Sequence, residues 1–229
     1  MKKVIVISLG GSLIIPDKIN FKFLDNLKKT LKKHYKNYKF IIVCGGGTIA
    51  RKYITMLRDE GKSKLALSQA GIRATRMNAM FMMQFFGKAD ANDALPKDMK
   101  EVKANLNKNN VVFCGALRYA ADSTSDGTSA KLAHYLKTDF INMTNVQGLY
   151  DKNPMTNKNA NFIPYESWKD FEKRAKKMTF HAGQHFVLDQ SAAIMIKKHK
   201  IKTYILGQDL KNLDKVLKGQ KFTGTLIYR

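Results

Sequence analysis

Short apolar runs alternate along the chain with longer segments in which apolar residues recur every three or four positions. The short runs are four or five residues long and contain many β-branched side chains, a pattern typical of strands buried on both faces of a sheet. We therefore predict strands at residues 4–7, 40–44, 111–114, 140–143 and 203–206, with a late strand at 224–228.

The longer segments predict amphipathic helices. Leu24, Leu27, Leu31 and Tyr35 form one apolar stripe, while lysines cover the rest of that segment. Comparable stripes predict helices at residues 50–57, 67–84, 126–136, 187–198 and 210–217. Because strands and helices alternate, we expect an α/β fold with a mainly parallel sheet.

Small or polar residues follow each predicted strand. Gly10 and Gly11 follow the first, and residues 45–47, all glycine, follow the second. Glycine allows tight turns and lets an anion approach the main chain. Thr48 is expected to cap the next helix, whose amino end would attract a phosphate. Ligands bind outside the carboxyl ends of parallel strands, so we expect one site built from these loops. The alternative is a set of tight turns without a ligand.

Two common nucleotide-binding motifs fit poorly. The chain contains no GxxxxGK followed by Ser or Thr, so a Walker phosphate loop is excluded. Gly45, Gly47 and Ala50 match a GxGxxA dinucleotide fingerprint. Asp59 and Glu60 come too soon to be the acidic residue that this fingerprint requires at the end of the next strand. An oxidoreductase therefore stays a weak alternative.

Composition is consistent with a globular protein. The 229 residues, 44% of them hydrophobic, can bury a full core, and no linker or repeat divides them, so we predict one domain over residues 1–229. Cys44 and Cys114 end predicted inner strands, which favours free thiols and a reducing cytoplasm. The first fifteen residues imitate a signal peptide, but no cleavage site follows, so a strand is favoured. Without a long apolar stretch, we expect a soluble protein and no membrane partner.

The net charge of +23 indicates anionic surroundings or partners. The lysines are spread over predicted helix faces and loops, and only Trp168 and scattered tyrosines could stack on bases. We therefore favour a solvated lysine-rich surface and keep nucleic-acid binding as the alternative.

Seven ordered motifs carry a resemblance to a known family. They are GGSL (10–13), VCGGGTIARKYI (43–54), AGIRATRMNAM (70–80), SDGTSAKLAHYL (125–136), TNVQGLYDKNP (144–154), AGQHFVLDQSAA (182–193) and GTLI (224–227). Across nearly the whole chain they resemble the amino acid kinase family and, within it, archaeal uridylate kinases. The resemblance implies a three-layer α/β/α sandwich that transfers the γ-phosphoryl of ATP to UMP with Mg²⁺. It also implies a homohexamer, with UMP held mainly by the amino-terminal part and ATP mainly by the carboxyl-terminal part.

The resemblance also assigns roles by position. Gly11, Arg51 and Asp189 correspond to catalytic positions. The positions that correspond to ATP-binding residues are Gly11, Ser12, Gly47, Arg51, Thr144, Asn145, Tyr150 and Asn153. Those that correspond to UMP-binding residues are Gly46, Ser68, Arg76, Asn78, Leu117, Thr124, Ser125 and Asp126. Asp126 could instead cap a helix, Asp189 could be a carboxylate favoured by the helix dipole, and the two arginines could be surface cations.

The chain departs from the family at several of these positions. Ser8 stands where many members have a lysine, and Ser68 where an acidic residue grips the UMP ribose. Gln147 and Asn153 replace aspartates, the acceptor loop at 117–125 is about two residues longer, and the strand expected at 88–95 is predicted to be lost or distorted. Two alternatives follow: a relative with another acceptor, such as isopentenyl phosphate, or a non-catalytic protein that binds nucleotides or nucleic acid.

His181 and His185 have the spacing of two metal ligands on a helix. Gly183 between them argues against a regular helix, so no metal site is predicted there.

Overall fold

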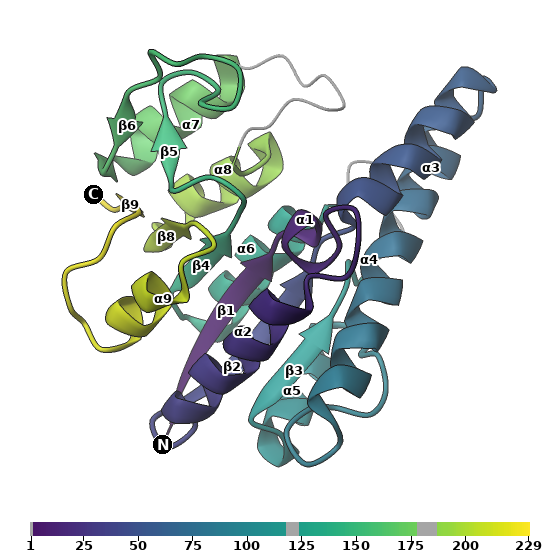
Figure 1. Cartoon of the computed structure of the whole chain (residues 1–229), viewed down its shortest axis with the longest axis vertical. Helices are drawn as coiled ribbons and strands as arrows, with labels where there is room; N and C mark the ends of the chain where they lie inside the picture. Colours follow the sequence, from purple (N-terminus) through teal and green to yellow (C-terminus); the bar gives the residue numbers. More distant parts are fainter. Residues whose placement is uncertain (1, 118–123, 178–186) are drawn as a thin grey trace.

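A seven-stranded sheet in the order β3-β2-β1-β4-β8-β9-β7 forms the middle of the fold (Figure 1). The computed structural model describes residues 2–117, 124–177 and 187–229. The five strands from β3 to β8 are parallel. Their bounds are β1 Lys3–Leu9, β2 Tyr38–Cys44, β3 Val111–Cys114, β4 Phe140–Met143 and β8 Thr203–Leu206.

Short strands complete the β structure. β9 (Thr225–Ile227) runs antiparallel to β8, and β7 (Tyr165–Glu166) runs parallel to β9. β5 (Leu149–Tyr150) and β6 (Phe162–Ile163) form a separate antiparallel pair after β4. These short strands all lie in the carboxyl-terminal part of the chain.

Helices cover both faces of the sheet. One face packs against α1 (Gly11–Ile14), α2 (Phe21–His34), α4 (Lys64–Phe86) and α9 (Leu210–Leu217). The other packs against α5 (Met99–Lys108), α6 (Ser125–Leu136), α7 (Trp168–Lys177) and α8 (Gln190–Lys198). Successive residues of β1 separate into the two cores, since Ile5 and Ile7 lie in the first and Val6 in the second. This arrangement confirms the predicted three-layer sandwich.

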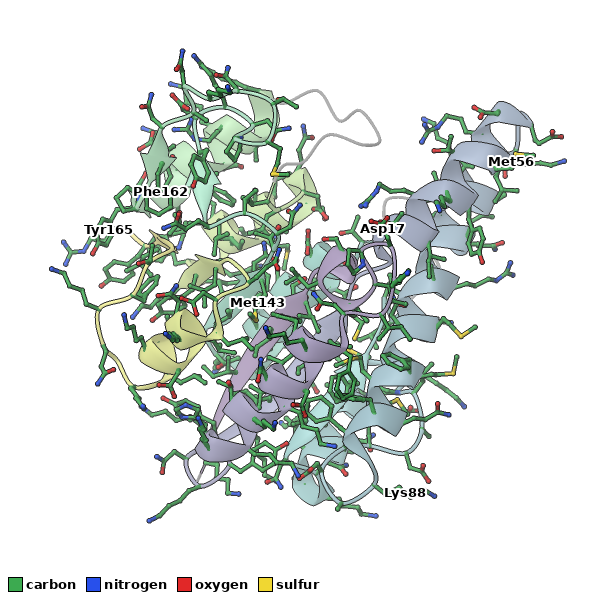
Figure 2. All side chains as sticks on the ribbon, in the orientation of Figure 1. Asp17, Met56, Lys88, Met143, Phe162 and Tyr165 are labelled. Carbon is green, nitrogen blue, oxygen red and sulfur yellow. The ribbon has the colours of Figure 1, made fainter. Side chains whose placement is uncertain are left out.

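Helix α3 (Gly47–Asp59) and the first half of α4 extend away from the sheet (Figure 1). Ala50 is the one buried residue of α3. Met56 lies near the far end of the projection, well away from Met143 at the end of β4 (Figure 2). Helix α3 therefore packs one side against α4 and leaves some of its apolar side chains exposed.

The apolar runs located the inner strands well, but two polar helices were not predicted. α5 buries only Val102 and Leu106, and α7 buries only Phe171 and Ala175. Helix α8 begins at Gln190, not at residue 187, because Val187 and Leu188 fill the core before the helix starts.

The segment at 88–95 is reduced to a single bridge between Ala91 and Val111. The side chain of Asn92 replaces the missing strand, because its amide donates to the Phe113 carbonyl at 3.0 Å and accepts from the Phe113 N–H at 2.7 Å. The outer edge of β3 is therefore satisfied without a regular strand, as the polar sequence there predicted.

Cys44 and Cys114 are both free thiols. Residue 114 pairs with Val43 across β2 and β3, so the two cysteines point to opposite faces of the sheet. Burial raises the pKa of Cys114 to about 12 and raises the pKa of Cys44 as well. Both side chains therefore act as small apolar groups. Within the described ranges, no helix is both long enough and apolar enough to cross a membrane.

Candidate active site

The loops that follow β1 and β2 touch each other through their glycines. The Gly45 N–H donates to the Leu9 carbonyl at 2.8 Å. A Cβ on Gly11 would lie 2.2 Å from the Gly47 nitrogen, and one on Gly45 would lie 2.7 Å from the Gly11 nitrogen. Gly47 also has a φ of +62°, which favours glycine. These two glycine loops therefore require residues without side chains.

Helices α1 and α3 begin in these loops, and neither has a side-chain cap. The other seven helices of the described ranges, by contrast, each begin with a side chain that accepts a backbone N–H. The prediction that Thr48 caps α3 is wrong, because the cap position is Gly46 and Thr48 lies inside the helix. Glycine at the cap leaves the first N–H groups available to an external anion.

Asp126 and Asp189 form a pair of carboxylates beside the end of β1. The Asp126 carboxylate accepts a 2.8 Å hydrogen bond from the hydroxyl of Ser8, which is 1% exposed. Burial, followed by repulsion from Asp189, raises the pKa of Asp126 to about 7. Part of the residue stays accessible, but its carboxyl group is turned inward toward Ser8. A cation that joined this pair would stabilise its ionised form.

Asp189 is held by three groups. It caps α8 by accepting the Ala192 N–H at 2.8 Å, and it also accepts hydrogen bonds from the hydroxyls of Ser191 and Thr124. Thr124 is in turn the cap of α6. The alternative prediction that Asp126 caps this helix is therefore wrong. The sequence also allowed that Asp189 is a carboxylate favoured by the helix dipole. Asp189 caps the amino end of α8, so it does interact favourably with that dipole.

Helices α6 and α8 approach closely at this point. A Cβ on Gly127 would lie 2.6 Å from the Ser191 hydroxyl oxygen and 3.1 Å from the Thr124 hydroxyl oxygen. The glycine in the SDGTSAK motif therefore lets the first turn of α6, with Ser125 and Asp126, lie against the start of α8.

Helix α4 supports the opposite side of the glycine loops. The buried Asn78 amide donates to the Gly45 carbonyl at 2.7 Å. Arg76 donates to the carbonyls of Ala116 and Leu117 at 3.1 and 2.9 Å, and so holds the start of the loop after β3. Ser68 lies half-buried on the same helix, nearer its amino end. Residues 118–123 of the predicted acceptor loop lie outside the described residues, as do His181 and His185.

The end of β4 joins the site through the main chain. The Gly10 N–H donates to the Met143 carbonyl at 3.0 Å, and the Thr144 N–H donates to the Leu206 carbonyl at 2.9 Å. The Thr144 hydroxyl lies 3.3 Å from the Asn145 amide oxygen. Thr144 and Asn145 are thus placed next to the first glycine loop.

Two predicted ATP residues lie further along this segment. Tyr150 packs edge-on against Phe162 at a centroid distance of 5.4 Å. The Asn153 side chain accepts the Met155 N–H at 2.9 Å and stabilises a turn. In the portion of the chain that is described, no hydrogen bond links Tyr150 or Asn153 to the glycine loops.

Arg51 is also apart from the carboxylates. Its side chain is exposed, and its guanidinium donates to the Thr48 hydroxyl at 3.0 Å. It forms no ion pair with Asp126, Asp189 or another residue whose position is described. Its catalytic role therefore stays a prediction.

Asn142 is a site residue that the sequence analysis missed. It is 3% exposed, lies beside Ser8 in the β1–β4 register, and donates to the Val187 carbonyl just before Asp189. The signal was available, because both Asn142 and Ser8 are polar residues inside otherwise apolar strands. A buried polar residue in an inner strand indicates a hydrogen-bonding duty.

The chain resembles known proteins over most of its length. The model of the amino acid kinase family matches residues 3–207. The chain belongs to the amino acid kinase family. It is 32% identical to the uridylate kinase of Archaeoglobus fulgidus over 224 residues, which is 97% of this chain and 99% of that protein.

Solved structures lead to the same family. The crystal structure of uridylate kinase from Archaeoglobus fulgidus matches with a TM-score of 0.82 and 32% identity, covering 99% of this chain and 100% of that one. The UMP kinase from Ureaplasma parvum matches with a TM-score of 0.80 and 20% identity over 100% of both chains, which supports the fold alone. The predicted family and fold are confirmed, as is the resemblance to archaeal uridylate kinases.

Proposed function

We propose that this chain is a nucleoside monophosphate kinase that transfers the γ-phosphoryl group of ATP to UMP, giving UDP and ADP. The observation that carries the proposal is the contact between two glycine loops at which the uncapped helices α1 and α3 begin. Each helix end presents free N–H groups, so two phosphate groups can be held next to each other. The relatives that are named uridylate kinases support UMP as the acceptor.

The reaction needs little covalent participation by the protein. An oxygen of the UMP phosphate forms a bond to the γ-phosphorus of ATP, the bond from that phosphorus to the β–γ bridging oxygen breaks, and ADP leaves. Catalysis of such a transfer depends mainly on positioning and on stabilising the charge of the moving group. The rigid contact between the glycine loops supplies the positioning.

On the ATP side, Gly11, Ser12 and Gly47 hold the phosphates through the amino end of α1 and the neighbouring turn. Thr144 and Asn145 lie beside Gly10 and hold the nucleoside, since the Gly10 N–H bonds the carbonyl that precedes Thr144. Tyr150 packs beside the adenine and Asn153 binds the ribose, which gives the carboxyl-terminal part of the chain most of the ATP contacts.

On the UMP side, Gly46 presents the amino end of α3 to the acceptor phosphate. Asn78 fixes the loop before it, and Arg76 holds the chain at Leu117, so both support the acceptor from α4. Ser68 binds the ribose through its hydroxyl. Thr124, Ser125 and Asp126, in the first turn of α6, complete the acceptor side in the amino-terminal part of a single domain.

The carboxylate pair fits Mg²⁺. Asp126 and Asp189 repel each other in a partly buried place, they offer only oxygen ligands, and neither pairs with a cation among the residues that the structure describes. The described ranges contain no group of three or more acidic, histidine or cysteine ligands, which suits Mg²⁺, because this ion keeps waters and substrate phosphates as its other ligands. When bound there by Asp126 and Asp189, Mg²⁺ would neutralise negative charge on the phosphates.

Ser8 changes how positive charge reaches the site. It occupies the position of the family's lysine and uses its hydroxyl on Asp126 instead. Arg51 stands one turn into α3 on an exposed, flexible side chain, so it can turn toward a phosphate at the helix end. We assign the missing cationic role to Arg51.

We also propose that the chain forms a homo-oligomer in the cytoplasm. Tyr53, Met56, Leu65 and Met77 are each at least half exposed on the projecting α3 and α4, and such apolar patches mark protein interfaces. If α3 and α4 of one copy packed against α3 and α4 of a second copy, these apolar side chains would be covered. The count of six follows from the family resemblance, and the buried free thiols fit a reducing compartment.

A coupled assay of ADP release with separate acceptors tests the proposed function. UMP, CMP, isopentenyl phosphate, carbamate and free amino acids are compared, each with and without Mg²⁺. We expect release that requires UMP and Mg²⁺ together. Faster release with isopentenyl phosphate would assign a different acceptor, and ATP binding without turnover would show a non-catalytic relative.

A further inference from the structure

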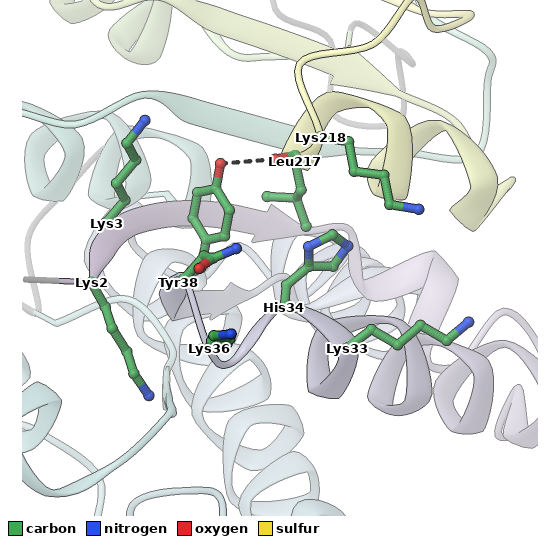
Figure 3. Close-up of a pocket in the computed structure, with 9 residues that line it drawn as sticks. Lys2, Lys3, Lys33, His34, Lys36, Tyr38, Leu217 and Lys218 are labelled. Carbon is green, nitrogen blue, oxygen red and sulfur yellow. Dashed lines mark hydrogen bonds between the residues drawn. The ribbon is translucent and has the colours of Figure 1, made fainter.

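A second feature lies at the opposite end of the sheet from the glycine loops. It is a hollow of about 870 Å³ lined by five lysines, Lys2, Lys3, Lys33, Lys36 and Lys218, and by no acidic residue among those described (Figure 3). Lys3 begins β1 and Tyr38 begins β2, whereas the glycine loops follow the far ends of these strands. Six residue steps along β1 separate the two ends by about 20 Å.

The floor of this hollow is built and fixed. The Tyr38 hydroxyl donates to the Leu217 carbonyl at 2.8 Å (Figure 3). His34, 6% exposed, places its Nε2 atom 2.8 Å from an Asp214 oxygen. These contacts join α2, β2 and α9 into one surface. The lysines therefore stand on a rigid base, and the hollow does not depend on a loop.

The lysine charges are only partly neutralised. Lys218 pairs with Asp214 at 2.7 Å, whereas Lys2 donates only to the uncharged Asn110 amide. Lys33 and Lys36 form no ion pair with any residue in the described ranges. Like charges held near each other repel. Binding of an anion would therefore lower the free energy of this surface.

A second hollow, of about 840 Å³, continues the surface between α2 and α9. It also has five lysines in its lining, Lys33 among them, and two aspartates, Asp209 and Asp214. Asp209 caps α9, and Asp214 is already engaged by Lys218 and His34. The two hollows thus form one lysine surface that follows α2.

The arrangement of the amino groups indicates the kind of anion. In Figure 3 the lysine side chains spread outward around Tyr38 and His34 and do not converge on one point. No arginine lines either hollow, so the bidentate contact that fixes a single phosphate is missing from these linings. Spread point charges suit a ligand with phosphates repeated along a chain.

We infer that this α2–α9 lysine surface is a binding site for the phosphate backbone of a nucleic-acid strand. Binding is independent of sequence, because the linings offer lysine charges, and the Tyr38 hydroxyl is already bonded to Leu217. It is also compatible with kinase activity, since the two sites lie at opposite ends of the sheet. The inference does not rest on the proposed function.

Fluorescence anisotropy with a labelled RNA of about 20 nucleotides, a length that spans a typical single-strand site, tests the inference. The test variant combines Lys2→Gln, Lys33→Gln and Lys36→Gln. Its matched control combines Lys62→Gln, Lys64→Gln and Lys173→Gln, which removes the same charge from exposed lysines outside both hollows. Thermal melting and kinase rate verify that each variant is folded.

We expect the wild type to bind, with an affinity that falls steeply between about 50 and 200 mM salt. The test variant should bind about tenfold more weakly at the lower salt, and the slope of log K against log salt should fall by about 2, since each phosphate contact contributes about 0.7. The control should stay within about twofold of the wild type. Unlabelled RNA, but not tripolyphosphate at equal phosphate concentration, should displace the label.

Three results would overturn the inference: no salt-dependent binding by the wild type, equal weakening in the test and control variants, or equal displacement by tripolyphosphate. The second result would assign binding to diffuse charge, and the third would assign the hollow to a compact anion.

Discussion

The two ends of the central sheet use different chemistry for the same kind of ligand. At the carboxyl end, phosphates would meet glycine main chain, two uncapped helix ends and a carboxylate pair, which hydrogen bonds of 2.7 to 3.0 Å hold in place. At the amino end, lysine side chains spread over an open surface. The first arrangement depends on position and the second on charge, so the two ends should respond differently to substitution.

The largest effect is expected where backbones touch. Gly11→Ala would place a methyl group 2.2 Å from the Gly47 nitrogen and 2.6 Å from the Gly45 carbonyl, and neither backbone can move freely. We expect a loss of about 3 kcal/mol or more in the free energy of unfolding, together with loss of activity. Urea denaturation and the ADP-release assay measure both.

Gly71→Ala is the matched control for this prediction. Gly71 lies inside α4, and the atom nearest to an added methyl group is the tip of Ile54 at 3.2 Å. Alanine is favoured over glycine within a helix by about 1 kcal/mol, so this variant should be as stable as the wild type or more so. Equal losses in both variants would show that the glycine loops are not special.

Asp189→Asn separates charge from structure. Asparagine can still cap α8, and its neutral amide relieves the repulsion on Asp126, so we expect the free energy of unfolding to equal or exceed that of the wild type. Loss of the negative charge beside the phosphates should lower kcat by about 100-fold. The kcat measured at saturating Mg²⁺ checks this, and an unchanged kcat would restrict Asp189 to capping.

Asp126→Asn tests the strain that burial and repulsion from Asp189 place on the Asp126 carboxyl group. Because the pKa of Asp126 is raised to about 7 in the folded chain and is near 3.8 when unfolded, the folded state holds the proton longer. The stability of the wild type should therefore fall relative to that of the variant as pH rises from about 4 to 7, and the difference should stay constant above 7. We expect a difference on the order of 2 kcal/mol, because the residue is partly exposed.

Urea denaturation at several pH values without Mg²⁺ measures this difference. The amide that replaces the Asp126 carboxyl group cannot ionise, so only the wild type should show the added pH dependence. If the difference in the free energy of unfolding between the variant and the wild type did not change with pH, the pair would not be strained. Added Mg²⁺ should narrow the gap at high pH.

Arg51→Ala should affect catalysis far more than stability. The exposed side chain hydrogen-bonds only Thr48 among the described residues, so the free energy of unfolding should change by less than about 0.5 kcal/mol. We expect kcat to fall by at least about tenfold if Arg51 supplies the charge that Ser8 cannot. Arg58→Ala, at the far end of the same exposed helix, is the control and should leave kcat unchanged. Equal losses of stability and activity in Arg51→Ala would make its role structural.

The sequence predicted the inner sheet because continuous apolar runs such as residues 40–44 are suited to burial on both faces. It missed α7, whose mostly charged residues bury only Phe171 and Ala175. The glycine loops were recognised as one site because strand ends of a parallel sheet share an edge. The bonds from Ser8 to Asp126 and from Thr124 to Asp189 join residues 118 and 65 positions apart, and no local pattern reveals such pairings.

The lysine surface shows the complementary limit. Net charge was evident from composition, but its lysines come from the start of β1, the end of α2 and the end of α9, which only the fold brings together. A residue count therefore could not distinguish a gathered surface from a dispersed one.

The predicted capping role of Thr48 was wrong, because the cap of α3 is Gly46 and the helix begins at Gly47.

A crystal structure with an adenosine–uridine bisubstrate analogue, in which phosphates link the two nucleosides, tests the central claim most directly. The account predicts that the phosphate chain crosses the contact between the glycine loops, with hydrogen bonds from the N–H groups at Gly11 and at the start of α3. Adenosine should lie toward Thr144 and uridine toward Arg76. An analogue bound away from both helix ends, or only among the lysines of α2 and α9, would contradict it.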